Sequence, residues 1–456
     1  METLKRKYGL LTGIAMVVGI VIGSGIFFKA PVVLVNTGGK LSLALIAWAT
    51  AGIIMVISAF CFAIMATRVQ KVNGVVDYIE VATNEKAGYT MGWYFSAVYY
   101  PILVGTLGFV TMSYFYTLCG YEGIRESWHF WLATAGLITL SFILNTVAPR
   151  IAGYYQVSTT FIKLVPIFFI AIIGSVMGFI NGNTVEAFNS IGVGVDIKND
   201  FGGAILATVF AYEGWVVATS INAEIKNAKK NLPIALVVGA VIVLLCYLLY
   251  YIGLSSLIPN TNDIIKYGNN APIKALNDVF GIGEFLFNLL VMISCLGTLN
   301  GLTIGCSRGM YSLAYRNQGI MPDKVKKVHP KFNMSIISSL IGYLISLFFL
   351  GIWMFSFMTE FVYLLTIDEL TIVFVYPTYI LIYLWIMKNC KDLKIFSRYV
   401  MPILAILASI FYVFVASGLF TLIVSKDVTR VISFAIFSGI VAVIMAVGLL
   451  NYRKRV

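Results

Sequence analysis

The sequence predicts an all-α polytopic membrane protein with twelve transmembrane helices. Of its 456 residues, 60% are hydrophobic and only 11% are charged, whereas a soluble domain is about half apolar and about a quarter charged. A helix needs about 20 apolar residues to cross a bilayer. Twelve stretches of the chain meet this requirement, roughly 9–35, 41–66, 88–119, 129–148, 150–178, 201–222, 231–257, 281–314, 334–353, 358–387, 398–424 and 430–452.

The first stretch follows three basic residues, Lys5, Arg6 and Lys7. This arrangement is similar to a signal peptide, but no small-residue cleavage site precedes the rest of the apolar run. We therefore expect it to remain as the first helix. The gaps between stretches are too short to hold a soluble domain, so the predicted protein consists of its membrane spans and their loops.

The basic residues predict the orientation, because Lys and Arg remain cytoplasmic in short loops. With both chain ends inside, most of the 32 basic residues fall in cytoplasmic segments. Such loops beside an anionic leaflet account for the net charge of +12 without a nucleic-acid partner. The segments placed outside hold Lys29, Lys40, Arg125, Lys198, Lys266, Lys274, Lys426 and Arg430.

The cysteine and histidine residues give no indication of a metal site, a cofactor or an enzyme. The six cysteines form no C-x-x-C pair, and the two histidines fall near predicted loops. An enzyme needs a nucleophile, an acid and a base in one pocket, and the charged residues inside the spans lack such a motif.

The first span carries a weak point in the stretch VVGIVIGSGIFFKAP, residues 17–31. Its centre is Gly23-Ser24-Gly25, and each glycine costs a helix interior about 1 kcal/mol relative to alanine. Glycines at this spacing also serve as close-packing devices between membrane helices. Taken alone, the motif favours that simpler interpretation.

A second weak point changes this interpretation. The sixth span, residues 205–219, is interrupted by Glu213-Gly214. Two broken spans five helices apart indicate two inverted five-helix repeats with substrate bound at the breaks. Amides at a new helix start attract a carboxylate, and carbonyls at a helix end attract a cation. The pair of breaks therefore suits a zwitterionic amino acid.

This interpretation predicts the domain organisation. The inverted-repeat core covers 1–397, with one repeat at 9–178 and the other at 201–387. Two further helices and a short cytoplasmic tail occupy 398–456.

Lys163 is an intramembrane lysine in the fifth span, about thirteen residues from Arg150. That distance is about 20 Å along a helix, which is too far for the side chain to reach the cytoplasmic surface. An intramembrane charge indicates a functional role by default. The alternative is a structural lysine that caps backbone carbonyls.

Two acidic residues, Asp368 and Glu369, lie in the tenth span at a depth of roughly 14 Å. One interpretation is a water-lined outer vestibule. The others are proton coupling and recognition of a cationic side chain, and these remain open.

Several motifs together resemble the amino acid–polyamine–organocation transporter superfamily, in particular its branch of L-type amino acid exchangers. The resemblance rests on GIVIGSGIFFKAP, FAYEGW, EIKNAKKNLPIAL, GTLNG and RGMYSLAYRNQGIMP, which lie between residues 19 and 322. It implies the inverted-repeat fold, in which helices 1, 2, 6 and 7 form a bundle that rocks against helices 3, 4, 8 and 9.

The resemblance also implies site residues. The substrate carboxylate meets the amides around Ser24 and Gly25, its amino group meets carbonyls at the breaks, and Phe210 closes over it as a gate. Lys163 takes the place of the sodium ion that related transporters bind, with the Tyr247 hydroxyl as its partner. The substrate-binding residues implied are Val21, Ile22, Gly23, Ser24, Gly25, Ile26, Phe210, Ala211, Glu213 and Gly214.

The predicted function is sodium-independent exchange of small or medium neutral L-amino acids across the plasma membrane, by alternating access. Val216 and Val217, which are apolar, favour neutral substrates. Glu213 and the acidic pair in the tenth span keep two alternatives open: proton coupling, and a cationic amino acid or polyamine substrate. A sensor with the same fold is a further alternative, although sensors usually have an additional cytoplasmic segment. An accessory subunit is neither indicated nor excluded.

Overall fold

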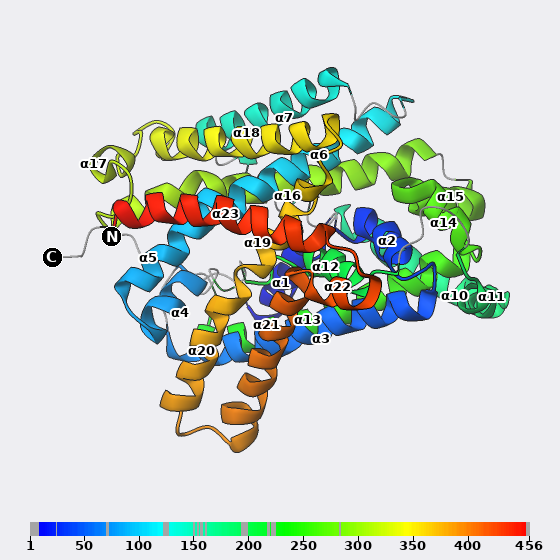
Figure 1. The fold of residues 1–456 in the computed structure, drawn as a ribbon, viewed down its shortest axis with the longest axis horizontal. Helices are drawn as coiled ribbons and strands as arrows, with labels where there is room; N and C mark the ends of the chain where they lie inside the picture. The colour runs from blue at the N-terminus through cyan, green and yellow to red at the C-terminus, as the bar shows by residue number, and fades with distance from the viewer. Residues whose placement is uncertain are drawn as a thin grey trace. The chain divides into compact units, whose positions relative to one another are not determined.

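The chain forms helices joined by short connections (Figure 1). The computed structural model describes residues 9–23, 25–69, 73–121, 127–148, 151–152, 155, 158–159, 162–192, 199–216, 219, 225–281 and 284–452. The basic residues before the first span, and the ends of the chain, lie outside these ranges. Within them, the β-structure consists of isolated bridge residues, among them the pairs Thr37–Asn199 and His329–Met334, which confirms the all-α prediction.

Nine helices in the described part of the chain are long and apolar enough to cross a membrane. Six of these spans are single helices with no interruption, and the other three combine consecutive helical segments. The nine are α3 (Leu41–Arg68), α5–η1–α6 (Glu85–Leu118), α7 (Trp128–Val147), α13 (Ala228–Leu257), α16 (Glu284–Tyr315), α18 (Ile336–Met358), η6–α19–α20 (Val362–Asn389), η7–α21 (Phe396–Ala416) and α23 (Thr429–Leu450).

The other three predicted stretches contain shorter helices. The first is α1 (Leu10–Val21) followed by α2 (Gly25–Asn36), and the sixth contains α12 (Phe201–Ala211). The fifth contains α9, η3 and α10 between Leu164 and Ile180, and it is bent by 94° from α11 (Asn183–Asn189). All twelve apolar stretches therefore correspond to helices, and the first and sixth are interrupted as predicted.

The chain divides into two compact units. The first unit comprises residues 1–82, 163–287 and 372–428, and the second comprises 83–162, 288–371 and 429–456. Helices 1, 2, 6 and 7 of the predicted topology belong to the first unit, whereas helices 3, 4, 8 and 9 belong to the second apart from the first turn of α16. This is the division into bundle and scaffold that the family resemblance implies.

In the first unit, α13 runs along both α1 and α3. Close approach is possible because a small residue lies at the contact: a Cβ atom on Gly239 would come within 2.6 Å of Val17 Cγ1. Small residues that let helix backbones approach are a common basis of helix association in membranes. The same helix supplies tyrosines to the site described below.

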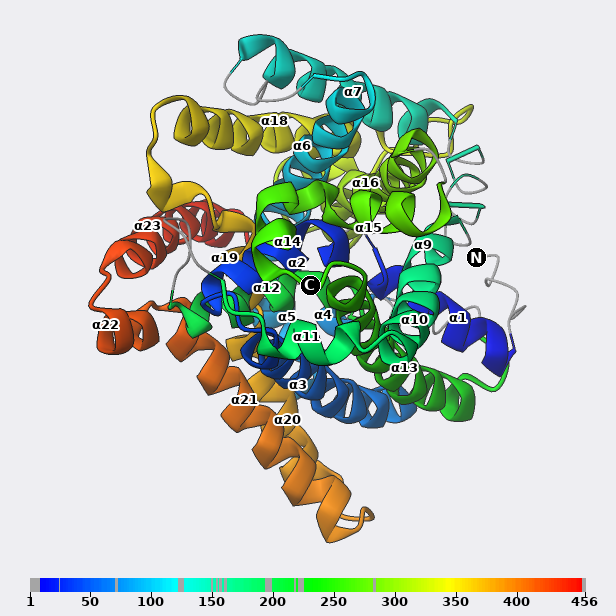
Figure 2. The ribbon, with the colours of Figure 1, turned by 90° about the vertical axis from the view of Figure 1, so that its right-hand side faces the viewer.

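In the second unit, α6, α7 and α18 lie side by side in both ribbon views (Figures 1 and 2). Buried polar side chains connect this group to α16: Asn145 Nδ2 donates to Asn300 Oδ1 at 2.9 Å, and Asn300 Nδ2 donates to the Ala152 carbonyl at 3.0 Å. Bonds of this kind satisfy polar groups that have no access to water in the bilayer core.

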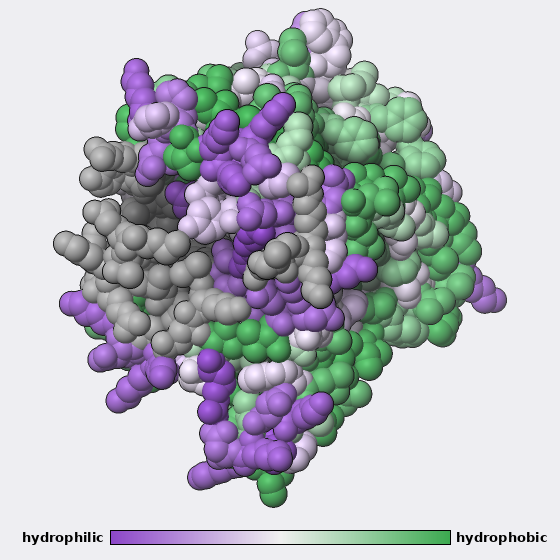
Figure 3. Space-filling view, turned by 90° about the vertical axis from the view of Figure 1, so that its left-hand side faces the viewer, coloured by the Kyte–Doolittle hydropathy of each residue, from purple (hydrophilic) through white to green (hydrophobic). Residues whose placement is uncertain are grey.

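The outer surfaces of the helices are apolar. On α7, four aliphatic side chains are about half exposed or more, and α18 has a similar row. Figure 3 shows broad hydrophobic areas of this kind, with hydrophilic residues gathered apart from them. Contiguous apolar surface is expected where helices face lipid. These side chains are Leu132, Leu140, Ile143 and Val147 on α7, and Leu340, Leu344, Phe348 and Phe355 on α18.

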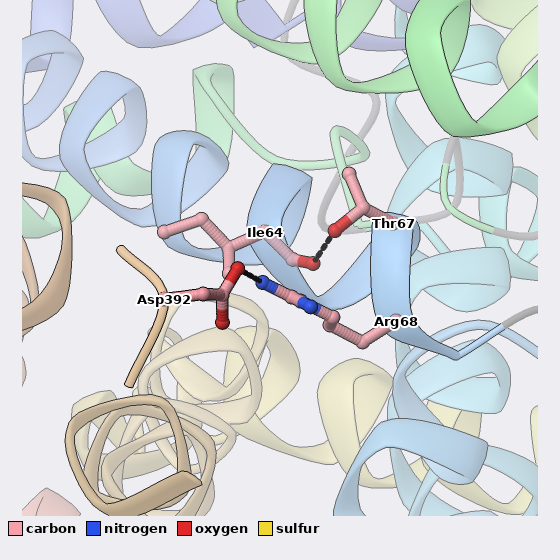
Figure 4. A network of polar contacts seen from close by, with 4 residues as sticks. All are labelled: Ile64, Thr67, Arg68 and Asp392. Atoms are coloured by element: carbon pink, nitrogen blue, oxygen red, sulfur yellow. Dashed lines mark hydrogen bonds and ion pairs between the residues drawn. The ribbon is translucent and has the colours of Figure 1, made fainter. Parts of the chain in front are cut away.

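An ion pair joins the end of α3 to the loop after α20 within the first unit (Figure 4). Arg68 donates a hydrogen bond to Asp392, and both side chains are exposed. The bond lowers the pKa of the Asp392 carboxyl below its ordinary value. Because exposed ion pairs contribute little to stability, its main effect is to fix the position of the loop relative to α3.

Candidate functional site

The first helix break lies between α1 and α2. The backbone leaves the helical conformation at Ile22, whose φ and ψ are −67° and 102°, and α2 begins at Gly25. Val21, Ile22 and Ile26 are all buried. Ser24, one of the predicted substrate contacts, lies outside the described residues. The break therefore places the start of a twelve-residue helix in the interior of the first unit.

The second break follows α12, which ends at Ala211. Residues 212–216 form a turn, and Gly214 has a φ of +104°, a conformation that L side chains rarely adopt. Glycine is thus required where the chain leaves this helix. Val217 lies outside the described residues, whereas Val216 is buried with 4% of its surface exposed.

The two breaks meet within the first unit. A Cβ atom on Gly25 would lie 2.8 Å from Ala211 Cα and 3.4 Å from Phe210 Cδ1, so the start of α2 rests directly on the end of α12. At their other ends the two helices are also joined, because the Asp200 amide donates to the Asn36 carbonyl at 2.8 Å. The contact with the Ala211 backbone therefore requires glycine at position 25.

Tyr247 on α13 connects the two helix ends. Its hydroxyl bonds to the carbonyl of Val21 at 3.2 Å and to the carbonyl of Ala211 at 3.0 Å. The sequence identified Tyr247, but as a partner of Lys163. Its bonds to both breaks were not foreseen.

An aromatic cluster supports this arrangement. Trp48 on α3 packs edge-on against Tyr212 and Tyr247, with ring centroids 5.8 and 5.6 Å apart. One turn along α13, the Tyr251 hydroxyl bonds to the Ala30 carbonyl on α2 at 3.2 Å. Two tyrosines of α13 therefore bond to the broken helices, Tyr247 to the ends of α1 and α12 and Tyr251 to α2.

The predicted gate, Phe210, is 8% exposed and lies against the ring of Phe28, with centroids 5.2 Å apart at 67°. Lys29 places its ammonium nitrogen 4.9 Å from the Phe210 centroid and 5.4 Å from the Phe28 centroid. Lys29 is itself buried, with 7% of its surface exposed. From the sequence alone, Lys29 is predicted only to lie in an outer segment.

Glu213 lies in the second break, close enough to two tyrosines of the first unit for its charge to affect them. It is half-buried, and its charge acts on the phenols of Tyr376 and Tyr412. These tyrosines belong to α20 (Tyr376–Asn389) and α21 (Met401–Ala416), which pack against each other.

Lys163 immediately precedes α9 (Leu164–Phe169) and is 2% exposed. Its burial agrees with the depth that the sequence indicates. It belongs to the same unit as both breaks. Its role at the position of a sodium ion stays a prediction.

Asp368 and Glu369 lie in the first turn of α19 (Ile367–Val373) and are 1% and 3% exposed. The dipole of a helix favours negative charge in its first turn. Both residues belong to the second unit, whereas the breaks belong to the first. Their predicted roles in proton coupling or side-chain recognition stay predictions.

The fold and the breaks define a class of protein: an all-helical membrane protein with opposed helix ends gathered at one buried site. The Amino acid permease family model matches residues 8–447, and the chain therefore belongs to the amino acid permease family. Its members carry solutes across membranes and are not enzymes, so the chain is an integral membrane amino acid permease.

Individual relatives are similar over about two thirds of the chain or more. The serine/threonine exchanger SteT of Bacillus subtilis is 32% identical over 333 residues, which cover 72% of this chain and 73% of the relative. The human b(0,+)-type amino acid transporter 1 is 28% identical over 313 residues, covering 68% and 63%. The human cystine/glutamate transporter is 26% identical over 331 residues, covering 72% and 64%. The match thus spans a little under two thirds of the two human relatives.

Proposed function

We propose that this permease exchanges small or medium neutral L-amino acids across the plasma membrane, without sodium and by alternating access. The main observation behind the proposal is that the two breaks lie together: Gly25 packs against Ala211, and the Tyr247 hydroxyl donates a hydrogen bond to the Ala211 carbonyl. The amides at the start of α2 are donors for a carboxylate, since a helix N-terminus favours an anion. The carbonyls that end α1 and α12 are acceptors for an ammonium group. An α-amino acid carries both groups on one carbon.

Exchange, rather than net uptake, is supported by the similarity to a serine/threonine exchanger. A small or medium neutral side chain fits the apolar character of Val216, which is buried next to the second break. Sodium independence rests on Lys163, whose buried ammonium takes the place of the ion. In this proposal the inverted-repeat core covers 1–397, with repeats at 9–178 and 201–387, and the region 398–456 adds two helices and a short cytoplasmic tail.

The orientation belongs to the same proposal. Both chain ends lie in the cytoplasm, because this arrangement places most of the basic loops inside. Arg68 at the end of α3 and the loop at Asp392 then lie together at the cytoplasmic side.

A second candidate function is proton-coupled uptake, and the surroundings of Glu213 favour it. This carboxylate is half-buried at a helix break, and its charge interacts with the phenols of Tyr376 and Tyr412. A carboxylate at membrane depth that exchanges a proton during the transport cycle is one way to couple a proton gradient to a substrate.

Purified protein in liposomes separates the two candidates. Vesicles are loaded with one unlabelled amino acid or left empty, and labelled serine, alanine, leucine or arginine is added outside in sodium-free buffer. Uptake that depends on internal amino acid supports exchange. Uptake into empty vesicles under an inward proton gradient supports symport instead. If neither condition gives uptake, both transport proposals are rejected.

A further inference from the structure

Lys29 is a buried cation directly beside the predicted gate. It lies on α2, four residues after Gly25, so the two residues share one face of the helix. Its ammonium nitrogen is 4.9 Å from the Phe210 ring centroid. The Cδ1 atom of the same ring lies 3.4 Å from the position of a Cβ atom on Gly25. One aromatic ring therefore extends from the substrate break to the lysine.

This position brings the charge close to any bound substrate. The backbones of Gly25 and Lys29 lie about one helical turn apart, or about 5.4 Å, and both the Gly25 position and the Lys29 ammonium lie close to the Phe210 ring. Charges at such separations interact strongly when protein rather than water lies between them, and dissolved salt does little to screen buried groups. The faces of Phe28 and Phe210 attract the cation and hold it in place.

We propose that Lys29 sets the charge selectivity of the site, disfavouring substrates with cationic side chains relative to neutral ones of the same size. The proposal rests on the function proposed above and specifies its substrate class further. An additional positive charge near the gate meets the ammonium of Lys29 in a buried environment, whereas an apolar side chain meets only the two rings. Lys29 thus determines specificity without accepting the α-amino or α-carboxyl group.

The probes are norleucine and lysine, because these amino acids have the same carbon chain and differ by the terminal amino group. Binding to the detergent-purified full chain is measured as the concentration dependence of thermal stabilisation. The wild type is expected to bind norleucine at least about tenfold more tightly than lysine. Equal binding of the two probes by the wild type would overturn the proposal without any variant.

The variants are Lys29→Met, which removes the charge, and Lys29→Arg, which keeps it. Lys40→Met is the matched control, because Lys40 is exposed at the start of α3 in the same unit. We expect Lys29→Met to reduce the preference for norleucine about tenfold, while Lys29→Arg and Lys40→Met keep it. An unchanged preference in Lys29→Met contradicts the proposal. If Lys29→Met does not give a monodisperse protein, Lys29→Gln is measured by the same criterion.

The binding assay also separates this proposal from the transport proposal. The same proteins are reconstituted, and counterflow of labelled leucine is measured. Charge-selective binding that depends on Lys29, without any flux, supports the role of Lys29 and rejects the proposed transport. Flux with charge selectivity that is independent of Lys29 supports transport and rejects the role of Lys29.

Discussion

Replacing Gly25 with alanine tests whether the contact between the two breaks forms the binding site. The new Cβ atom would lie 2.8 Å from Ala211 Cα and 3.3 Å from Ala211 Cβ. Ordinary contact between carbon atoms begins near about 3.5 Å, so α2 must move away from α12 by about 0.7 Å. Because the obstacle is backbone, no side-chain rotation relieves it. Overpacking of this kind costs about 1–3 kcal/mol of stability.

The displacement also moves the donors that receive the substrate carboxylate. We expect the KM for counterflow to rise about tenfold or more, since a displacement approaching 1 Å weakens interactions that depend on alignment. Gly136→Ala is the matched control, because a Cβ atom at Gly136 on α7 would meet nothing within 4 Å. That variant should keep the wild-type KM and melting temperature. A Gly25→Ala protein with both values unchanged refutes the account of the site.

Three further substitutions test the remaining elements of the site. Tyr247→Phe removes the hydroxyl shared by the two breaks, so it should lower the melting temperature and also weaken substrate binding, with a loss of about 1–3 kcal/mol. Its control is Tyr251→Phe, which frees only a carbonyl on α2 and should lower the melting temperature alone. Equal losses of substrate affinity in the two variants would argue against a special role for Tyr247. Lys163→Ala should abolish or uncouple transport while the protein remains monodisperse, and normal counterflow kinetics would remove its assigned role. Glu213→Gln should keep counterflow, because exchange needs no proton carrier; loss of a proton-driven uptake in this variant would instead favour the symport candidate.

The twelve apolar stretches and the two helix breaks could be predicted from the sequence, because both depend on local composition. The length and hydropathy of an apolar stretch identify a membrane span regardless of which helices it packs against. Gly23, Gly25 and Gly214 mark positions where helix formation is weak, and the structure interrupts the helices at these positions. The residues of a short stretch are therefore sufficient to predict a span or a helix break, because both depend mainly on that stretch itself.

The contacts around the breaks could not be predicted in this way, because they join residues that are far apart in the sequence. Lys29 and Phe210 meet only because α2 and α12 pack together. In the sequence, Lys29 has the same character as any basic residue near the outer end of a span. Its burial is the distinguishing property, and burial is determined by tertiary packing. The proximity of Glu213 to Tyr376 on α20 and Tyr412 on α21 has the same origin.

The chemistry of Tyr247 leads to a final prediction about the substrate. A phenol carries one proton, yet the Tyr247 hydroxyl lies within hydrogen-bond distance of two carbonyls, those of Val21 and Ala211. It can donate fully to only one of them at a time, so acceptor capacity remains for an ammonium group, which has three donors. Removing the amino group from the substrate should therefore weaken binding strongly. A charge-assisted hydrogen bond contributes about 1.5–3 kcal/mol, so 4-methylpentanoate, which is leucine without its amino group, should compete about 10- to 100-fold less well than leucine in counterflow. Competition equal to that of leucine would mean that the carbonyls at the breaks do not bind the ammonium group.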